Sequence, residues 1–247
     1  SQGKSVGNSK VDEKDTCDFY TNETIKGWYK DYIKTLLNHT NYYTGEKLMD
    51  SEAVFSWELS NEPRCTVDEF CKDDILYNWA AYVKSIDPYH MVSVGDEGFY
   101  NLGYQEAARQ DLPSSAYSGY YGVDFDKLMT IETVDFGTPH MYVDQWGFDL
   151  GDDDLEWIKR HAQTTSSADK PIIFEEFGLT DKTKRDAAYS DWLDIVTGDY
   201  YEGVEYQGFN YWMIASYLDD GTLYQDYDGY TVYGPEGIEK TDSTRTL

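Results

Sequence analysis

The chain alternates short apolar segments with amphipathic helical segments, and this alternation limits the folds open to it. The apolar segments have the length and composition of buried strands; they are 54–59, 91–94, 134–141, 172–174 and 209–214. Three- and four-residue apolar spacing predicts helices before or between them; these are 25–37, 74–86, 153–162 and 186–196. A strand, a polar strand end and then a helix, repeated along the chain, predict a parallel α/β protein.

Polar or aromatic side chains that could take part in catalysis or binding lie at the ends of these predicted strands. They are Asn61 and Glu62, Glu97, His140 and Tyr142, Glu176, and Trp212. In a (β/α)8 barrel the functional groups lie at the C-terminal ends of the strands, whereas a doubly wound nucleotide fold needs a Gly-rich loop after its first strand. The sequence has no such loop, so we predict a (β/α)8 TIM barrel.

Only about the last five β/α units of such a barrel are evident. Residues 1–17 are polar and aperiodic and predict a leader or loop. Residues 18–247 then form the C-terminal two-thirds of a single catalytic barrel domain. A five-stranded arc exposes two parallel edges. We therefore expect the chain to be part of a longer polypeptide, rather than completed by a partner or miscounted in its strands.

Charge and aromatic content narrow the choice of partner. The formal net charge of −27 repels nucleic acid and anionic membranes but is indifferent to a neutral ligand. The chain is 17% aromatic, with 24 Tyr and 7 Trp. These side chains offer flat apolar faces with a polar edge, which suits stacking on sugar rings. A neutral carbohydrate is the favoured partner.

The cysteines and two sequons indicate an exported protein. Cys65 and Cys71 are close in sequence across a predicted loop and could form a disulfide, which leaves Cys17 free or bonded outside the chain. Zinc fits poorly because no nearby residue completes four ligands. Asn22 and Asn38 stand in glycosylation sequons. Together with the acidity, these features favour a secreted, extracellular protein.

Acidic clusters do not form a recognisable calcium loop. In the cluster at 226–229, Tyr224 stands where the first ligand of an EF-hand loop belongs, and Pro235 where its closing Glu belongs. Asp152, in the other cluster, is expected to cap a helix that has acids in its first turn. We expect no metal and no cofactor.

Several ordered motifs resemble one enzyme family. The string Trp57-Glu58-Leu59-Ser60-Asn61-Glu62-Pro63-Arg64-Cys65 resembles the fungal-type endo-β-1,4-mannanases of glycoside hydrolase family 5. The same pattern includes Glu176-Phe177-Gly178 and four further segments, at 95–99, 139–142, 209–213 and 219–229. The resemblance covers about residues 19 to 233.

The resemblance implies retaining hydrolysis of internal β-1,4-mannosidic bonds by double displacement. Glu62 would be the acid/base, which calls for a raised pKa, and Glu176 the ionised nucleophile. Such a pair needs its carboxyl groups about 5 to 5.5 Å apart. Glu175 is the rival nucleophile. Strand alternation sends neighbouring side chains to opposite faces, and the family pattern selects Glu176.

The resemblance also implies contacts around this pair. Asn61 would hold the sugar 2-hydroxyl beside the nucleophile, His140 and Tyr142 would orient the catalytic carboxylates, and Trp212 would form a stacking floor. The remaining implied substrate contacts line the cleft or extend the sugar platform; they are Arg64, Glu97 and Trp146.

Two alternatives to a mannanase stay open. One is a β-1,4-glucanase of the same family, because the catalytic pair does not distinguish mannose from glucose. The other is a non-catalytic, carbohydrate-binding barrel fragment, because an Arg and a second His that serve the family's active site would lie upstream of this chain. With the full domain present, a monomer is expected.

Overall fold

The computed structural model describes residues 13–65, 75–198 and 205–234, and all pairs of named strands within these ranges are parallel. The pairs are β1 (Ser56–Glu58) with β2 (Met91–Ser93), β3 (His140–Tyr142) with β5 (Glu176–Gly178), β4 (Ile173–Phe174) with β6 (Gly208–Phe209), and β7 (Ile214–Ala215) with β8 (Val232–Tyr233). The predicted parallel α/β architecture is confirmed.

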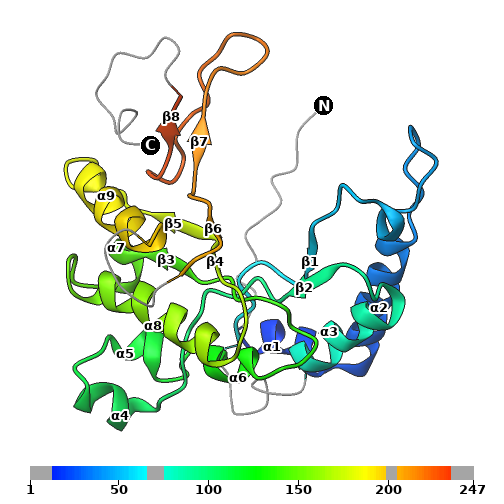
Figure 1. Cartoon of the computed structure of the whole chain (residues 1–247), viewed down its shortest axis with the longest axis horizontal. Helices are drawn as coiled ribbons and strands as arrows, with labels where there is room; N and C mark the ends of the chain where they lie inside the picture. The colour runs from blue at the N-terminus through cyan, green and yellow to red at the C-terminus, as the bar shows by residue number, and fades with distance from the viewer. Residues whose placement is uncertain (1–12, 66–74, 199–204, 235–247) are drawn as a thin grey trace, which may run out of the picture.

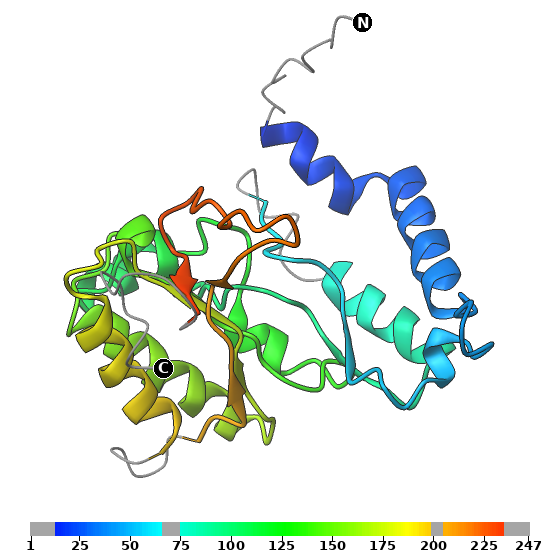
Figure 2. The ribbon, with the colours of Figure 1, turned by 90° about the horizontal axis from the view of Figure 1, so that it is seen from above.

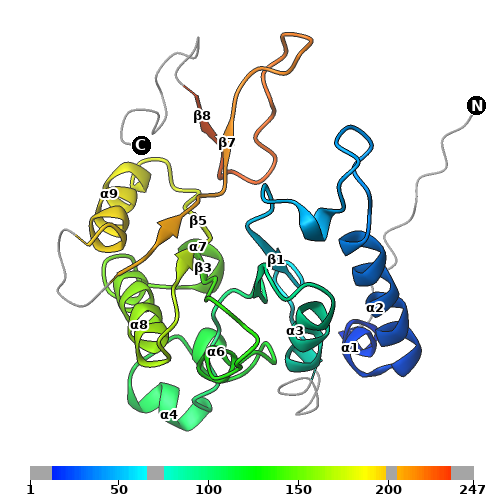
Figure 3. The same ribbon diagram turned by 45° about the vertical axis from the view of Figure 1, so that its right-hand side comes forward.

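The helices follow the outside of these strands (Figure 1; Figure 3 from another side). They are α1 (Glu13–Thr21), α2 (Glu23–Leu37), α3 (Ile75–Ile86), α4 (Tyr104–Arg109), α5 (Ser114–Tyr117), α6 (Phe125–Met129), α7 (Val143–Trp146), α8 (Asp153–Ser167) and α9 (Arg185–Val196), with a short 3₁₀ turn η1 (Leu48–Asp50). Seen from above (Figure 2), α2 packs beside α3 at one end of the molecule and α8 beside α9 at the other.

The strands form an arc that does not close within the described residues. Backbone hydrogen bonds carry it from β2 to the segment before β3, where Asp135 N donates to Val92 O at 2.7 Å. They carry it on to β4, where Ile173 N donates to Gly137 O at 2.9 Å. At its start, β1 pairs with β2 alone among the described strands. The strands thus bring their C-terminal ends to one curved rim, as a barrel does.

The side chain that caps the helix differs from the expected one at α8. At α2, Asn22 Oδ1 accepts hydrogen bonds from Thr24 N at 2.9 Å and Ile25 N at 3.4 Å, so Asn22 caps the helix. Asp152 stands at the N-cap position of α8, but its side chain makes no cap hydrogen bond. Asp153 Oδ2 and Asp154 Oδ1 instead accept from backbone N–H groups just ahead of the helix. The acidic first turn is confirmed, while Asp152 as the capping side chain is wrong.

The N-terminal helix and its disulfide correct two sequence predictions. The last residues of the predicted 1–17 leader belong to α1, while 1–12 lie outside the described residues. Cys17 on α1 is bonded to Cys65, with an S–S distance of 2.03 Å and Cα atoms 5.2 Å apart. The predicted Cys65–Cys71 bond is therefore wrong; Cys71 lies outside the described residues. Packing of α1 against the rest of the chain brings together two cysteines 48 residues apart.

A buried arginine ties the two ends of the C-terminal part together. Arg185, at the start of α9, is fully buried. Its guanidinium donates to Leu179 O at 2.7 Å, to Thr231 O at 3.1 Å and to Gly229 O at 2.6 Å. Because a buried cation needs its donors satisfied, these bonds fix the segment before β8 against the end of β5.

Candidate active site

Glu62 is held in an unusual backbone conformation just beyond β1. Its φ is 51°, in the left-handed region that non-glycine residues rarely adopt. The backbone there is secured by Glu62 N donating to Gly95 O at 2.8 Å and Ser60 N donating to Val94 O at 3.1 Å. Strained backbone of this kind concentrates at functional sites. Here it presents a half-buried carboxylate at the rim.

Glu176 is the first residue of β5 and lies opposite His140 of β3 in the parallel register. Tyr142 OH donates to Glu176 Oε2 at 2.5 Å. Burial, together with this neighbouring carboxylate, raises the pKa of Tyr142, so the phenol keeps its proton and remains a donor. This hydrogen bond fixes the position of the Glu176 carboxyl group.

His140 lies between the carboxylates and is fully buried. Its Nδ1 is 3.0 Å from Glu62 Oε1 and 3.6 Å from Glu176 Oε2, and its Nε2 is 3.3 Å from Glu175 Oε2. Burial lowers the pKa of His140, but hydrogen bonds to Glu175 and Glu62 outweigh burial and raise it to about 10. The ring therefore carries a positive charge that draws three carboxylates together.

The two candidate catalytic carboxylates lie close enough to act on one bond. One carboxylate oxygen of Glu62, one of Glu176 and a ring nitrogen of His140 all lie within 4.8 Å of one another. This separation fits a retaining pair, which needs about 5 to 5.5 Å. Three such ligands could also contact a metal ion. Since both ring nitrogens already face carboxylates, however, a metal would have to displace the bond between His140 and Glu62.

The pKa of Glu62 moves opposite to the expected direction. Burial raises it, but the hydrogen bond and charge of His140 and the charge of Arg64 outweigh burial, and the pKa is lowered. The sequence pointed to a raised pKa because it showed the carboxylate without its cationic neighbours. The proton needed for acid catalysis is instead held within the pair formed by Glu62 and His140.

Arg64 and Glu97 form a structural pair beside Glu62. Glu97 is 0% exposed and makes an ion pair with Arg64, whose guanidinium also lies 4.7 Å from the Tyr121 ring centroid. Burial raises the pKa of Glu97 to about 7, against the opposing effect of Arg64. The prediction that Glu97 lines the cleft as a substrate contact is therefore wrong. Arg64 stays partly exposed and lies 3.5 Å from Glu62.

The remaining predicted contacts divide between core and rim. Trp146 is 7% exposed and packs edge-on against Phe148 and Trp157, so its ring belongs to the core and cannot extend a sugar platform. Trp212 is 42% exposed, and its indole N–H donates to Asp228 Oδ2 at 2.8 Å. Asn61 is exposed next to Glu62. Trp212 and Asn61 thus remain available to a ligand.

Glu175 is a residue whose place the sequence reasoning missed. Alternation along one strand would have sent it away from Glu176, yet both contact His140. The reason is a break in the strand: β4 ends at Phe174 and β5 begins at Glu176, so Glu175 lies between two short strands. Two consecutive acids at the end of an apolar run were the signal for it.

Comparison with known proteins places this chain in a family. A family model described as GH family 5 beta-mannosidase-like matches residues 7–222. A "Probable mannan endo-1,4-beta-mannosidase F" of Neosartorya fischeri is 38% identical over 182 residues, which are 72% of this chain and 35% of the relative. A "Mannan endo-1,4-beta-mannosidase A" of Aspergillus aculeatus is 37% identical over 196 residues, 74% of this chain and 46% of the relative.

Solved structures agree. An endo-β-1,4-mannanase from Thermotoga petrophila matches with a TM-score of 0.76 and 34% identity, over 89% of this chain and 49% of that one. An endo-1,4-β-mannanase from Rhizomucor miehei matches with a TM-score of 0.72 and 33% identity, over 88% of this chain and 59% of that one.

The fold is that of glycoside hydrolases built on a (β/α)8 barrel, of which the described strands form an arc. The chain belongs to glycoside hydrolase family 5, in its β-mannosidase-like group. It spans between about a third and a half of the length of the curated relatives it matches. None of the described helices is both long and apolar enough to cross a membrane.

Proposed function

We propose that the protein is a retaining endo-β-1,4-mannanase, which hydrolyses internal β-1,4-mannosidic bonds by double displacement. The observation that carries the proposal is the juxtaposition of Glu62 and Glu176, which share His140 and have carboxylate oxygens within 4.8 Å of each other. The similar proteins whose names specify mannan support mannan as the substrate.

In the first step Glu176 attacks the anomeric carbon while a proton passes from Glu62 to the leaving glycosidic oxygen. The Tyr142 hydroxyl, hydrogen-bonded to Glu176, keeps the nucleophile aligned. In the second step Glu62 removes a proton from water, which attacks the glycosyl-enzyme and releases Glu176. Both steps need Glu62 to exchange a proton, and its direct bond to His140 provides a local place for that proton.

Trp212 and Asn61 are the proposed substrate contacts at the rim. The exposed indole face of Trp212 would stack on a sugar ring, and Asn61 would bind the 2-hydroxyl next to the nucleophile. Arg64 would contact substrate through the part of its guanidinium that Glu97 leaves free. The net charge of −27 does not oppose a neutral polysaccharide.

Localisation and assembly are proposals of the same kind. The Cys17–Cys65 disulfide is typical of a protein that matures in an oxidising compartment. Two sequon asparagines, Asn22 and Asn38, reach the surface at the two ends of α2. A secreted protein, in which α1 and the residues after it form part of the catalytic domain, accounts for these features. We expect it to act as a monomer.

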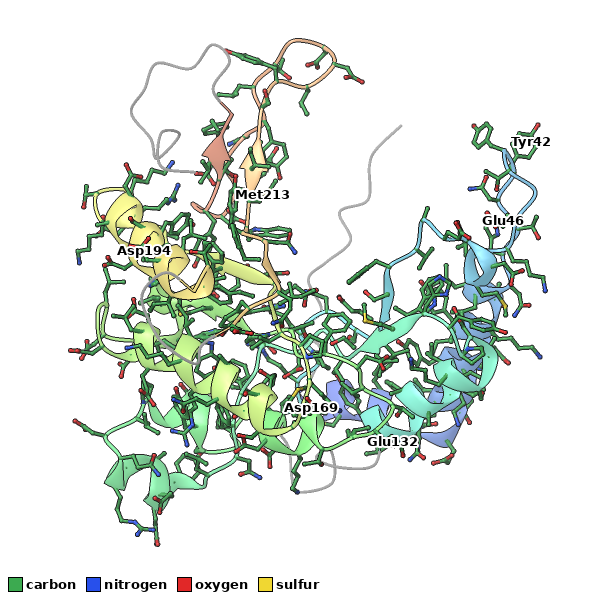
Figure 4. All side chains as sticks on the ribbon, viewed as in Figure 1. Tyr42, Glu46, Glu132, Asp169, Asp194 and Met213 are labelled. Carbon is green, nitrogen blue, oxygen red and sulfur yellow. A yellow bond between two sulfur atoms is a disulfide. The ribbon has the colours of Figure 1, made fainter. Side chains whose placement is uncertain are left out.

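The test is reducing-sugar release from mannan and from soluble cellulose by the full-length protein. Glu62→Ala and Glu176→Ala should each lower kcat/KM by roughly 10²-fold or more. Glu46→Ala is the matched control, because Glu46 lies exposed on a loop remote from the strands (Figure 4) and should leave activity unchanged. Added azide should rescue Glu176→Ala and yield a glycosyl azide of inverted configuration.

Two results would overturn the proposal. A clear preference for cellulose would identify a glucanase of the same family. Binding of mannan without hydrolysis, together with no effect of Glu176→Ala, would identify a carbohydrate-binding barrel.

A further inference from the structure

Two carboxyl groups that the proposed reaction does not use lie next to His140. Glu175 Oε2 is 3.3 Å from His140 Nε2, on the opposite side of the ring from Glu62. Glu58, the last residue of β1, makes a side-chain hydrogen bond to Glu175. The four side chains thus form one hydrogen-bonded chain in the order Glu58, Glu175, His140, Glu62.

The backbone fixes each member of this chain in place. Glu175 N donates to Pro139 O at 3.1 Å, and His140 N donates to Glu97 O at 3.0 Å. Glu58 is paired with Ser93 in the register of β1 and β2. The series of hydrogen-bonded side chains therefore starts on β1 and crosses to the segments around β4 and β3. It ends at Glu62, in the loop after β1. Its members hold these positions through the sheet itself, independently of substrate.

We propose that Glu58 and Glu175 are positioning residues for Glu62, which they orient and supply with a proton through His140. This inference rests on the proposed function for the role of Glu62. Neither residue touches the reacting atoms; both act on the ring that does contact Glu62.

The geometry shows which of these groups carry a proton. Carboxylates accept hydrogen bonds, so a ring with a carboxylate at each nitrogen donates from both and is an imidazolium. When the Nδ1 proton moves to Glu62, that carboxyl becomes the acid, while Nε2 still donates to Glu175. The proton count is unchanged, and Glu175 holds the ring in place in both states.

Glu58 sets how strongly Glu175 attracts the ring. Solvent reaches Glu58 at the open edge of the sheet. Partial burial and then the hydrogen bond with Glu175 raise the pKa of Glu58 to about 8. Two carboxyl groups can form a hydrogen bond only when one of them carries a proton, and we assign that proton to Glu58, which donates it to Glu175. A carboxylate that already accepts one hydrogen bond pulls less on His140. Glu58 therefore weakens the hold of Glu175 on the imidazolium and favours transfer of the proton to Glu62.

The charged groups around His140 determine how its proton is divided between the ring and Glu62. Glu62, Glu175 and Glu176 contact the ring directly, and all three stabilise its charged form. Asp96 and Glu97 act at longer range from the segment after β2, and the pKa of Asp96 is raised to about 7 by burial. Arg64, bonded to Glu97, is the neighbouring cation and faces Glu62.

The primary test is the titration of the His140 ring nitrogens by NMR in the full-length protein, with the signal assigned from His140→Gln. In the wild type both nitrogens should stay protonated to about pH 10. Glu175→Gln removes the partner charge and should lower the midpoint by about 1 to 3 pH units. Glu58→Ala removes the donor to Glu175 and should raise it, whereas Glu58→Gln, whose amide can still donate, should leave it near the wild-type value.

The pH dependence of activity is the second test. The basic limb of kcat/KM on mannan should move in the same directions, and Glu58→Ala should lose roughly 2- to 10-fold while Glu58→Gln keeps most of its activity. The His161 signal and the Glu46→Gln variant are the controls, since both lie outside the chain of contacts and neither should change.

A midpoint unmoved by Glu175→Gln, or lowered by Glu58→Ala, would overturn the inference. The second result would mean that Glu58 is ionised and acts as a further negative charge. If either variant fails to fold by circular dichroism, the other carries the same test. If the wild type fails to hydrolyse mannan, the proposed function falls, while the His140 titration still decides the hydrogen-bonded chain.

Discussion

Replacing Cys17 with serine should cost the protein about 4 kcal/mol of folding free energy. The disulfide between Cys17 and Cys65 closes a segment with a sequence separation of 48. Closing a loop of that length in the unfolded chain removes entropy worth about 4 kcal/mol at 25 °C. For a chain of 247 residues the unfolding entropy is about 0.5 kcal/mol per degree. The expected fall in Tm is therefore about 8 °C.

The assay is thermal and urea unfolding of the wild type, Cys17→Ser, Cys65→Ser and the double variant, with and without reductant. Because the two cysteines share one bond, the double variant should lose no more stability than either single variant. Reductant should bring the wild type close to the variants and leave the variants unchanged. If Cys17→Ser unfolds at the same midpoint as the wild type, the reasoning is refuted. That result would be expected if Cys65 were bonded to Cys71, because Cys17 would then be free and its replacement would break no disulfide.

Two further predictions concern an acid-sensitive contact and the sugar platform. Asp87 accepts hydrogen bonds from Trp57 Nε1 at 2.7 Å and from two backbone N–H groups; burial opposes these bonds, but they win and lower its pKa. The contribution of the Asp87 carboxylate to stability is full above about pH 4 and is lost as the pH falls through the lowered pKa. In urea unfolding, Asp87→Asn should therefore be less stable than the wild type by about 2 kcal/mol at neutral pH, and the two should converge in acid. A stability difference that stays constant with pH would contradict this. Trp212→Ala should lower kcat/KM on manno-oligosaccharides roughly tenfold, mainly through KM, and Trp212→Phe, which keeps an aromatic face, should lose less; equal losses would exclude stacking.

The elements that the sequence predicted well are those whose signal is local. Helix α2 has apolar residues at regular helical spacing and an asparagine at its start, and it begins and ends close to the expected positions. The five predicted strand regions all contain strands, because short apolar runs that end in polar residues are typical of buried parallel strands. Short helices such as α4, α5 and α7 were missed, since four to six residues carry too little periodicity.

The errors share a different cause. Trp146 and Glu97 were expected at a cleft, but both are buried, Trp146 partly against Phe99 and Glu97 in an ion pair with Arg64, partners that lie far from them in the sequence. Glu175 was expected to point away from Glu176, but a break between β4 and β5 brings both to His140. The expected rise in the pKa of Glu62 became a fall because His140, 78 residues away, lies 3.0 Å from it.

The sequence by itself determined the parallel α/β class, the strand ends that carry the functional groups, and Glu62 and Glu176 as the candidate pair. The first two follow from the order and spacing of neighbouring residues, and the pair follows from the resemblance of its motifs to glycoside hydrolase family 5. Only the tertiary structure decided that Cys17 pairs with Cys65, that Glu58 and Glu175 extend from the candidate pair through His140, and that Trp212 has an exposed ring while Trp146 is buried. These depend on distance and burial between segments far apart in the chain, which local patterning does not encode.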